Sequence, residues 1–332
     1  MSPLVPQKYS ERLGVIDPDQ LFAVAERFDL GDVTAAEPAT TGLFGQNIFL
    51  TTSKGRFVLR GHPHGHVQLT KERRVADFID ERSSLPAPWP YVVCDDTEVF
   101  GWTYALMPML EGTTGSTLWE TADEAGRLAL AAAAGEALAR LHEADSEFFG
   151  PYDAQLDDFV EMDDFGDWAL HRLQHWRSAC RAVNALSTGA EQYIDDLIEA
   201  CAPALSEPFT PVLVHHDFKL GNLNFELTGD AFEPTGVFDL MEAYIADGEE
   251  DIVRMLWSLQ ADDQRNAFVD AYTAHYPFRP GAAERLALYA LSDWLVIWEY
   301  GRRVGSWFED TTFMESVQPI IRTARAIGSS RT

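Results

Sequence analysis

One change of pattern near Pro108 divides the sequence. Upstream of it, short alternating or β-branched runs predict five strands, which are interrupted by one helical segment, Leu69–Arg82. Downstream, apolar residues recur with helical spacing, and only the stretch 212–240 is rich in β-formers. We therefore expect an α+β fold with a small five-stranded antiparallel lobe and one helix at 1–108, a hinge near 107–112, and a larger, mainly helical lobe at 109–332. The expected strands are Val33–Thr40, Asn47–Thr52, Arg56–Arg60, Tyr91–Cys94 and Val99–Met107.

Charge and composition limit the partners and the compartment. The formal net charge is −28 at pH 7, and a field of this sign repels nucleic acids and anionic membranes, so we expect neither as a partner. The acidity favours a cationic ligand, but salt adaptation or genome composition explains it equally well, and both interpretations stay open. No apolar run approaches the roughly 18 residues that span a bilayer. The three cysteines form no CxxC pair, so we expect the reducing environment of the cytoplasm.

The β-rich stretch contains the most specific motif of the chain. An apolar strand leads into His215-x-Asp217 and a loop that ends at Asn222, and a later apolar strand presents Asp239. Phosphoryl transfer to a hydroxyl needs one carboxylate that orients the hydroxyl and takes its proton. An amide oxygen and a second carboxylate are hard ligands that can hold Mg²⁺ against a nucleoside triphosphate. The motif therefore predicts a kinase, with Asp217 as the base and with Asn222 and Asp239 as metal ligands.

The pattern HxDxxxxN, followed by two apolar residues and an aspartate, resembles the aminoglycoside phosphotransferase-like kinases, a branch of the protein-kinase-like fold. The resemblance implies a bilobal enzyme that uses ATP or GTP with Mg²⁺, Asp217 as the catalytic base and His215 as a brace for the loop. Lys219 either neutralises charge on the transferred phosphoryl group or is an ordinary surface lysine. Most members have glycine where this chain has His216, and this difference could change how substrate meets the loop.

The first predicted lobe contains a second kinase feature. A kinase-like fold needs a strand cation for the α- and β-phosphates, held by a glutamate of the adjoining helix. Arg60 ends one predicted strand, and Glu72 lies on the apolar face of the predicted helix, three and four residues before Val75 and Ala76. A carboxylate on that face is unfavourable unless it meets a buried cation. We therefore expect Arg60 and Glu72 to form a pair that binds the nucleotide.

Two further segments are weaker candidates for nucleotide contacts. The turn with Gly42 and Gly45 lies between the first two strands, where backbone amides could cover phosphates, although it lacks a full GxGxxG pattern. The segment YALMPMLEG looks like the family's adenine-binding linker, and backbone groups of Met107 and Met109 would meet the base edge. Both segments could equally be a hairpin turn and strand core.

Downstream of Asp239, the segment 246–251 occupies the place of the family's GDPxxDL motif. Its two aspartates, Asp247 and Asp251, keep the family spacing although the leading glycine and the proline are replaced. In relatives these residues cap the next helix and tether the catalytic loop. We expect Asp247 to be the N-cap of a helix at 252–259.

The phosphate acceptor stays open at this level. Carboxylates and aromatic residues are dense at 153–168, and further acids such as Asp293 and Glu299 lie in the last helices beside tryptophans. Such groups bind amine-bearing sugars, including aminoglycosides, and a globally acidic surface is the alternative explanation for them. Neutral sugars, amino alcohols and other metabolites are alternative acceptors, and a catalytically silent nucleotide-binding module is an alternative function. A protein kinase is disfavoured because FDL replaces DFG and no APE segment follows. The oligomeric state is not predicted.

Overall fold

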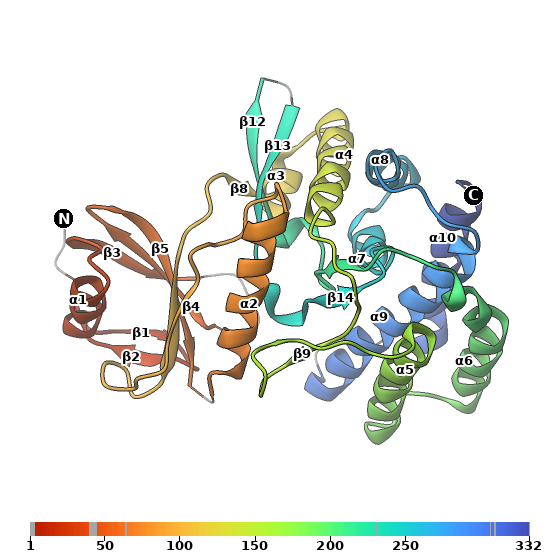
Figure 1. Cartoon of the computed structure of the whole chain (residues 1–332), viewed down its shortest axis with the longest axis horizontal. Coiled ribbons are helices and arrows are strands. Elements are labelled where there is room, and N and C mark those ends of the chain that lie inside the picture. The colour runs from red at the N-terminus through yellow and green to blue at the C-terminus, as the bar shows by residue number, and fades with distance from the viewer. Residues whose placement is uncertain are drawn as a thin grey trace. The chain divides into compact units, whose positions relative to one another are not determined.

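The computed structural model describes residues 4–39, 45–63, 65–229, 231–305, 307–308 and 310–331. The chain divides into two compact units. Unit 1 contains Met1–Gly112, Tyr152–Asp158 and Thr235–Met241, and unit 2 contains Thr113–Pro151, Phe159–Pro234 and Glu242–Thr332. The expected α+β class, with an antiparallel sheet in the N-terminal region and helices in the C-terminal region, is confirmed (Figure 1).

Unit 1 includes two later segments, which the sequence placed in the second lobe. The first is held by ion pairs of Arg73 with Asp157 and of Arg74 with Asp158. The second is held by backbone bonds, because the Val237 amide donates to the Pro86 carbonyl at 2.9 Å. These contacts join residues far apart in the chain, so local sequence patterns do not reveal them.

The sheet of unit 1 has five antiparallel strands in the order β3-β4-β5-β7-β6. In β4, Ile48, Leu50 and Thr52 alternate with less buried residues, as expected where successive side chains point to opposite faces. The strand expected at Val99–Met107 starts later than predicted. Strand β7 begins at Thr103, because the chain turns at Gly101, whose φ is 78°. The strands are β3 (Val33–Pro38), β4 (Asn47–Thr52), β5 (Gly55–His62), β6 (Val92–Cys94) and β7 (Thr103–Pro108).

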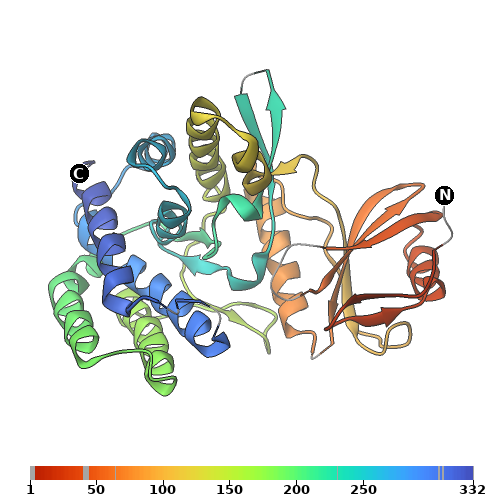
Figure 2. The same ribbon diagram turned by 180° about the vertical axis from the view of Figure 1, so that it is seen from behind.

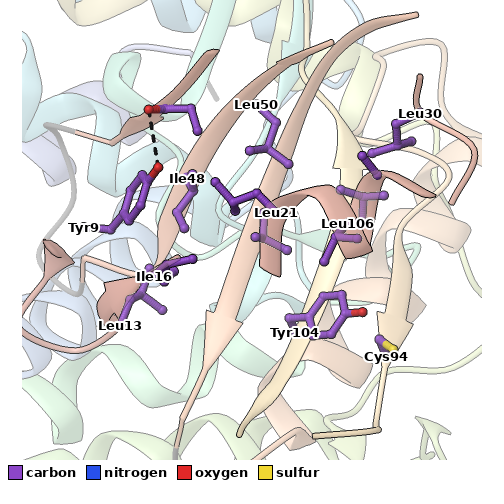
Figure 3. Packing of buried hydrophobic residues seen from close by; sticks show 14 residues of the cluster. Tyr9, Leu13, Ile16, Leu21, Leu30, Ile48, Leu50, Cys94, Tyr104 and Leu106 are labelled. Atoms are coloured by element: carbon purple, nitrogen blue, oxygen red, sulfur yellow. Dashed lines mark hydrogen bonds between the residues drawn. The ribbon is translucent and has the colours of Figure 1, made fainter. Parts of the chain in front are cut away.

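A hydrophobic cluster covers one face of this sheet. Figure 3 shows Ile48 and Leu50 of the sheet packed with Leu21 of α1 (Pro18–Arg27) and with Tyr9 and Ile16 of the N-terminal hairpin. The sequence did not predict this hairpin, which consists of the short strands β1 (Gln7–Ser10) and β2 (Gly14–Ile16). Leu59 of β5 belongs to this cluster. Because successive side chains of a strand point to opposite faces, its neighbours in β5 point to the other face of the sheet. Helix α2 (Val67–Arg82) covers that other face (Figure 1).

Unit 2 is mainly helical. Helix α4 packs against α8, and α9 packs against α10, as Figure 2 shows for the two blue helices. None of the helices in the described ranges is long and apolar enough to cross a membrane. The helices are α3 (Gly115–Thr121), α4 (Glu124–Leu141), α5 (Phe165–Ala182), α6 (Thr188–Cys201), α7 (Glu250–Ser258), α8 (Asp262–Thr273), α9 (Ala282–Val304) and α10 (Phe313–Ser329), with 3-10 turns η1 (Ala202–Ser206), η2 (Leu220–Asn222) and η3 (Leu240–Glu242).

Two small sheets position the motif residues. Strand β11 (Val212–Val214) is fully buried and pairs antiparallel with β14 (Tyr244–Ala246), whose strand character the sequence did not predict. The second sheet has the order β13-β12-β8. The remaining strands are β8 (Thr113–Thr114), β9 (Tyr152–Asp153), β10 (Asp158–Phe159), β12 (Leu223–Thr228) and β13 (Ala231–Val237).

The contact between α4 and α8 depends on Gly135. A Cβ at this position would lie 2.2 Å from the Phe268 carbonyl oxygen. A Gly135→Ala variant should therefore lower the free energy of unfolding by about 1–3 kcal/mol through overpacking, although alanine normally favours a helix by about 1 kcal/mol. Gly189→Ala in α6 is the control, because its nearest neighbour would be 3.9 Å away. Urea denaturation measures both, and equal stability of Gly135→Ala and wild type would contradict the close approach.

Candidate active site

The loop after β11 is held by Asp251, the second residue of α7. Its Oδ2 accepts the His215 amide and its Oδ1 accepts the His216 amide, both at 2.7 Å. Asp251 is only 1% exposed, so these bonds are shielded from water and supported by charge. The expected tether of the loop is therefore present in unit 2.

Asp251 is itself held from the end of α4. His142 Nε2 lies 3.3 Å from Asp251 Oδ2, and His142 Nδ1 lies 3.0 Å from the Tyr272 hydroxyl. The His142 side chain is fully buried. His142 is the C-cap residue of α4, and its ring belongs to the polar network that holds Asp251.

Asp217 is bound from three sides within unit 2. Its Oδ2 accepts bonds from Lys219 Nζ at 2.6 Å and from Asn222 Nδ2 at 2.9 Å. The Asp217 amide lies 3.2 Å from His215 Nδ1, which agrees with a bracing role for His215. Burial raises the pKa of Asp217, but Arg254 and Lys219 outweigh burial and the pKa is lowered overall. The carboxylate is therefore ionised near neutral pH.

Arg254 of α7 is a neighbour of Asp217 that the sequence did not reveal. Its Nη1 lies 3.2 Å from Asp217 Oδ1, while Nε and Nη2 bind Asp293 Oδ1 of α9 at 3.0 and 2.6 Å. Its position three residues after Asp251 puts both side chains on one helix face. That spacing is the signal that could have identified it.

His216 occupies a strained position in the loop. Its φ is 64°, a region where glycine is favoured, which gives a physical reason for the glycine that most family members have there. The ring lies 5.2 Å from that of Tyr244. Burial, with the nearby Arg254 and Arg172, lowers the pKa of His216 to about 3, so the ring is neutral.

In unit 1, Arg60 and Glu72 form a buried pair. Glu72 Oε1 accepts from Arg60 Nη2 at 2.9 Å and from Nε at 3.2 Å, and the residues are 2% and 8% exposed, respectively. Gln68 and Tyr91 also donate to Glu72, at 2.7 and 3.0 Å, and neither was expected. Burial lowers the pKa of Arg60, but the charge of Glu72 outweighs it and the pKa is raised, so the guanidinium stays charged.

Asp239 lies in the same unit as this pair. Its Oδ1 is 3.4 Å from Arg60 Nη2, its φ is 65°, and its side chain is 37% exposed. Asn222 belongs to unit 2 and donates through Nδ2, which leaves Oδ1 for a cation. In the described ranges, no group of three or more His, Cys, Asp or Glu could bind a metal alone. Mg²⁺ commonly uses one or two protein oxygens together with phosphates, so these residue types fit it.

The glycine turn and the linker, the two weaker candidates for nucleotide contacts, differ in which of their backbone groups are already bonded. Gly45 has φ 54°, and its carbonyl accepts a bond from Ser10 Oγ at 2.6 Å, which ties it to β1. Gly42 lies outside the described residues. Met107 is a buried residue of β7, and the Met109 amide donates to the Arg56 carbonyl at 3.0 Å. The Met109 N–H is therefore engaged in unit 1, and only its carbonyl remains for a base edge.

Four of the acidic residues at 153–168 and in the last helices pair with arginines of the protein itself. Asp293 binds Arg254 and also accepts from Trp257 Nε1 at 2.8 Å, and Glu299 pairs with Arg303 at 2.9 Å. Asp157 and Asp158 pair with arginines of α2, as described above. These acids therefore stabilise the protein itself.

The expectation that Asp247 caps a helix at 252–259 is wrong. Helix α7 begins at Glu250, and its N-cap residue is Glu249. Asp247 Oδ2 instead accepts from the Tyr289 hydroxyl at 2.7 Å and pairs with Arg279. Asp247 Oδ1 still accepts from the Glu249 amide at 3.2 Å, but Glu249 precedes the first residue of the helix, so Asp247 lies two residues too early to be its N-cap.

An Asp251→Asn variant should lose about 2–4 kcal/mol of unfolding free energy. An asparagine can accept only one of the two loop amides well, and its own NH₂ group would face the other, which leaves a buried donor unpaired. The matched control is Asp164→Asn, because the N-cap bond of Asp164 to the Asp167 amide is one that asparagine also makes. Denaturant unfolding of both variants measures the difference, and a loss as small as that of the control would refute the tether.

The His216→Gly variant should change how stability depends on pH. The unfolded chain binds a proton at His216 below about pH 6.5, whereas the folded chain does so only near pH 3. Wild type should therefore lose stability relative to His216→Gly by up to about 1.4 kcal/mol for each pH unit below 6.5. Unfolding free energies between pH 7 and 5 test this, and parallel pH profiles would show that His216 is not held neutral.

The comparisons with known proteins agree with this geometry. The model of the "Phosphotransferase enzyme family" (APH) matches residues 36–289, well over half of the chain. In sequence, 191 residues are 26% identical to a protein of Arabidopsis thaliana named probable acyl-CoA dehydrogenase IBR3; the match covers 54% of this chain but only 22% of that protein.

Solved structures share the fold at low sequence identity. Aminoglycoside phosphotransferase APH(4)-Ia is 18% identical, with a TM-score of 0.63 and coverage of 94% of this chain and 98% of that chain. APH(2")-IIIa, solved with GDP and kanamycin, is 16% identical, with a TM-score of 0.62 and coverage of 95% and 99%. A Thermobifida fusca YX-ER1 protein, a fructosamine-3-kinase candidate by name, is 18% identical, with a TM-score of 0.60 and coverage of 92% and 98%. The fold is that of these protein-kinase-like phosphotransferases, and the chain belongs to the phosphotransferase enzyme family.

Proposed function

We propose that the protein transfers the γ-phosphoryl group of ATP or GTP to a hydroxyl of a small molecule. The observation that carries this proposal is the ionised carboxylate of Asp217, bound by Lys219 and Asn222 on a loop whose backbone is fixed by Asp251. Phosphoryl transfer requires a carboxylate that orients the acceptor hydroxyl, and Asp217 supplies one on this loop.

Asp217 would orient the acceptor hydroxyl and take its proton. The lowered pKa of Asp217 makes its carboxylate a weak base. A weak base is sufficient for a loose transition state, because such a reaction depends more on the position of the hydroxyl than on early removal of its proton. Lys219, whose Nζ contacts Asp217, would offset negative charge that develops on the transferred group. His215 holds the backbone of the loop and does not react.

The nucleotide-binding residues that we propose follow from the motifs of the family. Arg60, kept charged by Glu72, would contact the α- and β-phosphates, and the carbonyl of Met109 is the remaining linker group for the base. Mg²⁺ would be held by Asn222 Oδ1 and the Asp239 carboxylate, where it offsets the charge of the triphosphate. Family neighbours support nucleotide binding, since APH(4)-Ia has been solved with ADP and with AMP-PNP.

For the acceptor, we propose a hydroxylated small molecule of the cytoplasm rather than a polycationic aminoglycoside. APH(4)-Ia binds hygromycin B, which supports the aminoglycoside alternative. Against it, the carboxylates Asp293 and Glu299 already neutralise arginines. A panel of neutral sugars, amino alcohols, hydroxy acids and aminoglycosides decides between these classes, and turnover of aminoglycosides alone would contradict the preference.

An Asp217→Asn variant should lower the turnover number by about 10²–10⁴-fold, because it keeps the shape but removes the base. Nucleotide affinity, measured by calorimetry, should stay within about twofold. Release of nucleoside diphosphate in the presence of Mg²⁺ and the acceptor panel measures turnover. The control Asp262→Asn changes an exposed carboxylate of α8 that pairs only locally with Arg265. An Asp217→Asn enzyme with wild-type turnover would refute the mechanism.

A further inference from the structure

Helix α7 contacts the catalytic loop at two successive positions on one face. Asp251 binds the loop backbone at His215 and His216, and one turn later Arg254 meets the side chain of Asp217. Residues three apart on a helix are neighbours, so a single rigid element fixes both the main chain and the reactive side chain.

The orientation of the Arg254 guanidinium is set from the far side by α9. Nε and Nη2 both donate to Asp293 Oδ1, and the other oxygen of Asp293 accepts from Trp257 Nε1 at 2.8 Å. Asp293 is 2% exposed, so this pairing is shielded from water. With two of its nitrogens engaged by Asp293, the planar fork presents Nη1 to Asp217 Oδ1.

The two oxygens of Asp217 are held differently. Oδ2 is bound by Lys219, which is 39% exposed at its side chain, and by Asn222, which we propose as a metal ligand. Oδ1 is buried and makes no aligned hydrogen bond with the described residues, and Arg254 lies against it as an ion-pair partner. The Arg254 side chain is 16% exposed, less than that of Lys219, and it is anchored by Asp293 independently of the loop.

We propose that Arg254, anchored by Asp293, is a positioning residue that fixes the plane of the Asp217 carboxylate before substrates bind. This inference rests on the proposed phosphoryl transfer. Without Arg254, the carboxylate would keep only the contacts of Lys219 and Asn222 and could rotate about its side-chain bonds. A misplacement of about 1 Å at a reacting group can lower a rate by about 100-fold.

The test uses the full chain with the paired substitution Arg254→Met and Asp293→Asn. The pair removes the cation without leaving a buried carboxylate unpaired, which protects the fold. With Mg²⁺, nucleotide and the acceptor found in the panel, we expect kcat to fall about 100-fold while the KM for nucleotide stays within about twofold. Arg254→Lys should recover only part of kcat, since one ammonium cannot serve both carboxylates in the geometry of the fork.

Arg177→Met is the matched control. Arg177 is a buried arginine of unit 2 that, like Arg254, pairs with two carboxylates, here Glu191 and Asp195, and none of its contacts in the described ranges reaches the loop. Its kcat should stay within about twofold of wild type. An equal loss in Arg177→Met, an unchanged kcat in the paired variant, or full recovery by Arg254→Lys would each overturn the inference.

Crystal structures of the nucleotide-free wild type and paired variant provide a readout that needs no acceptor. We expect Asp217 to leave its wild-type side-chain conformation while both loop amides stay on Asp251. An unmoved Asp217 would overturn the inference whatever the activity. If the wild type transfers no phosphoryl group to any acceptor, the proposed function fails, and the crystal structures alone decide the role of Arg254.

Discussion

The buried carboxylate of Asp251 is the constraint on which the rest of the catalytic loop depends. It accepts two consecutive loop amides and lies in the first turn of α7, where the helix dipole favours a negative charge. Strand β14 pairs with β11 and leads through a short segment into α7, so the strand that delivers the loop and the helix that holds it are joined by one sheet. The position of Asp217 follows from that arrangement, because the two residues that precede it have their backbone amides fixed by Asp251.

Much of the loop and of the Arg60–Glu72 pair could be predicted from the sequence, because both depend on short spacings. Four residues separate Asp217 from Asn222, and the helix period places Glu72 among buried side chains. The Arg254–Asp293 pair could not be predicted, because it depends on how α7 and α9 approach each other. The same holds for the N-terminal hairpin and β14, whose strands have only three or four residues and gain their stability from tertiary packing.

The net acidity of the chain does not by itself identify a ligand. The excess of acidic over basic residues gives −28 overall, yet several buried carboxylates near the loop are paired with arginines. Glu250 binds Arg172, and Glu249 binds Arg285, both in buried positions. A buried carboxylate must be paired, so its count in the sequence reports internal pairing as much as an external field. The charge around Asp217 is therefore set by its own neighbours, and two of these, Lys219 and Arg254, are cations.

The bonds from the His215 and His216 amides to Asp251 imply that the catalytic loop is formed before any ligand binds. Hydrogen exchange of the His215 and His216 amides tests this claim most directly, since both protons lie in the bonds to Asp251. The exchange can be followed by NMR on protein labelled with ¹⁵N-histidine, because the chain contains only nine histidines. Without nucleotide, both amides should exchange at least about 1,000-fold more slowly than an unfolded chain, as buried bonds that open only with larger parts of the structure do. Exchange as fast as in an exposed loop would contradict the account.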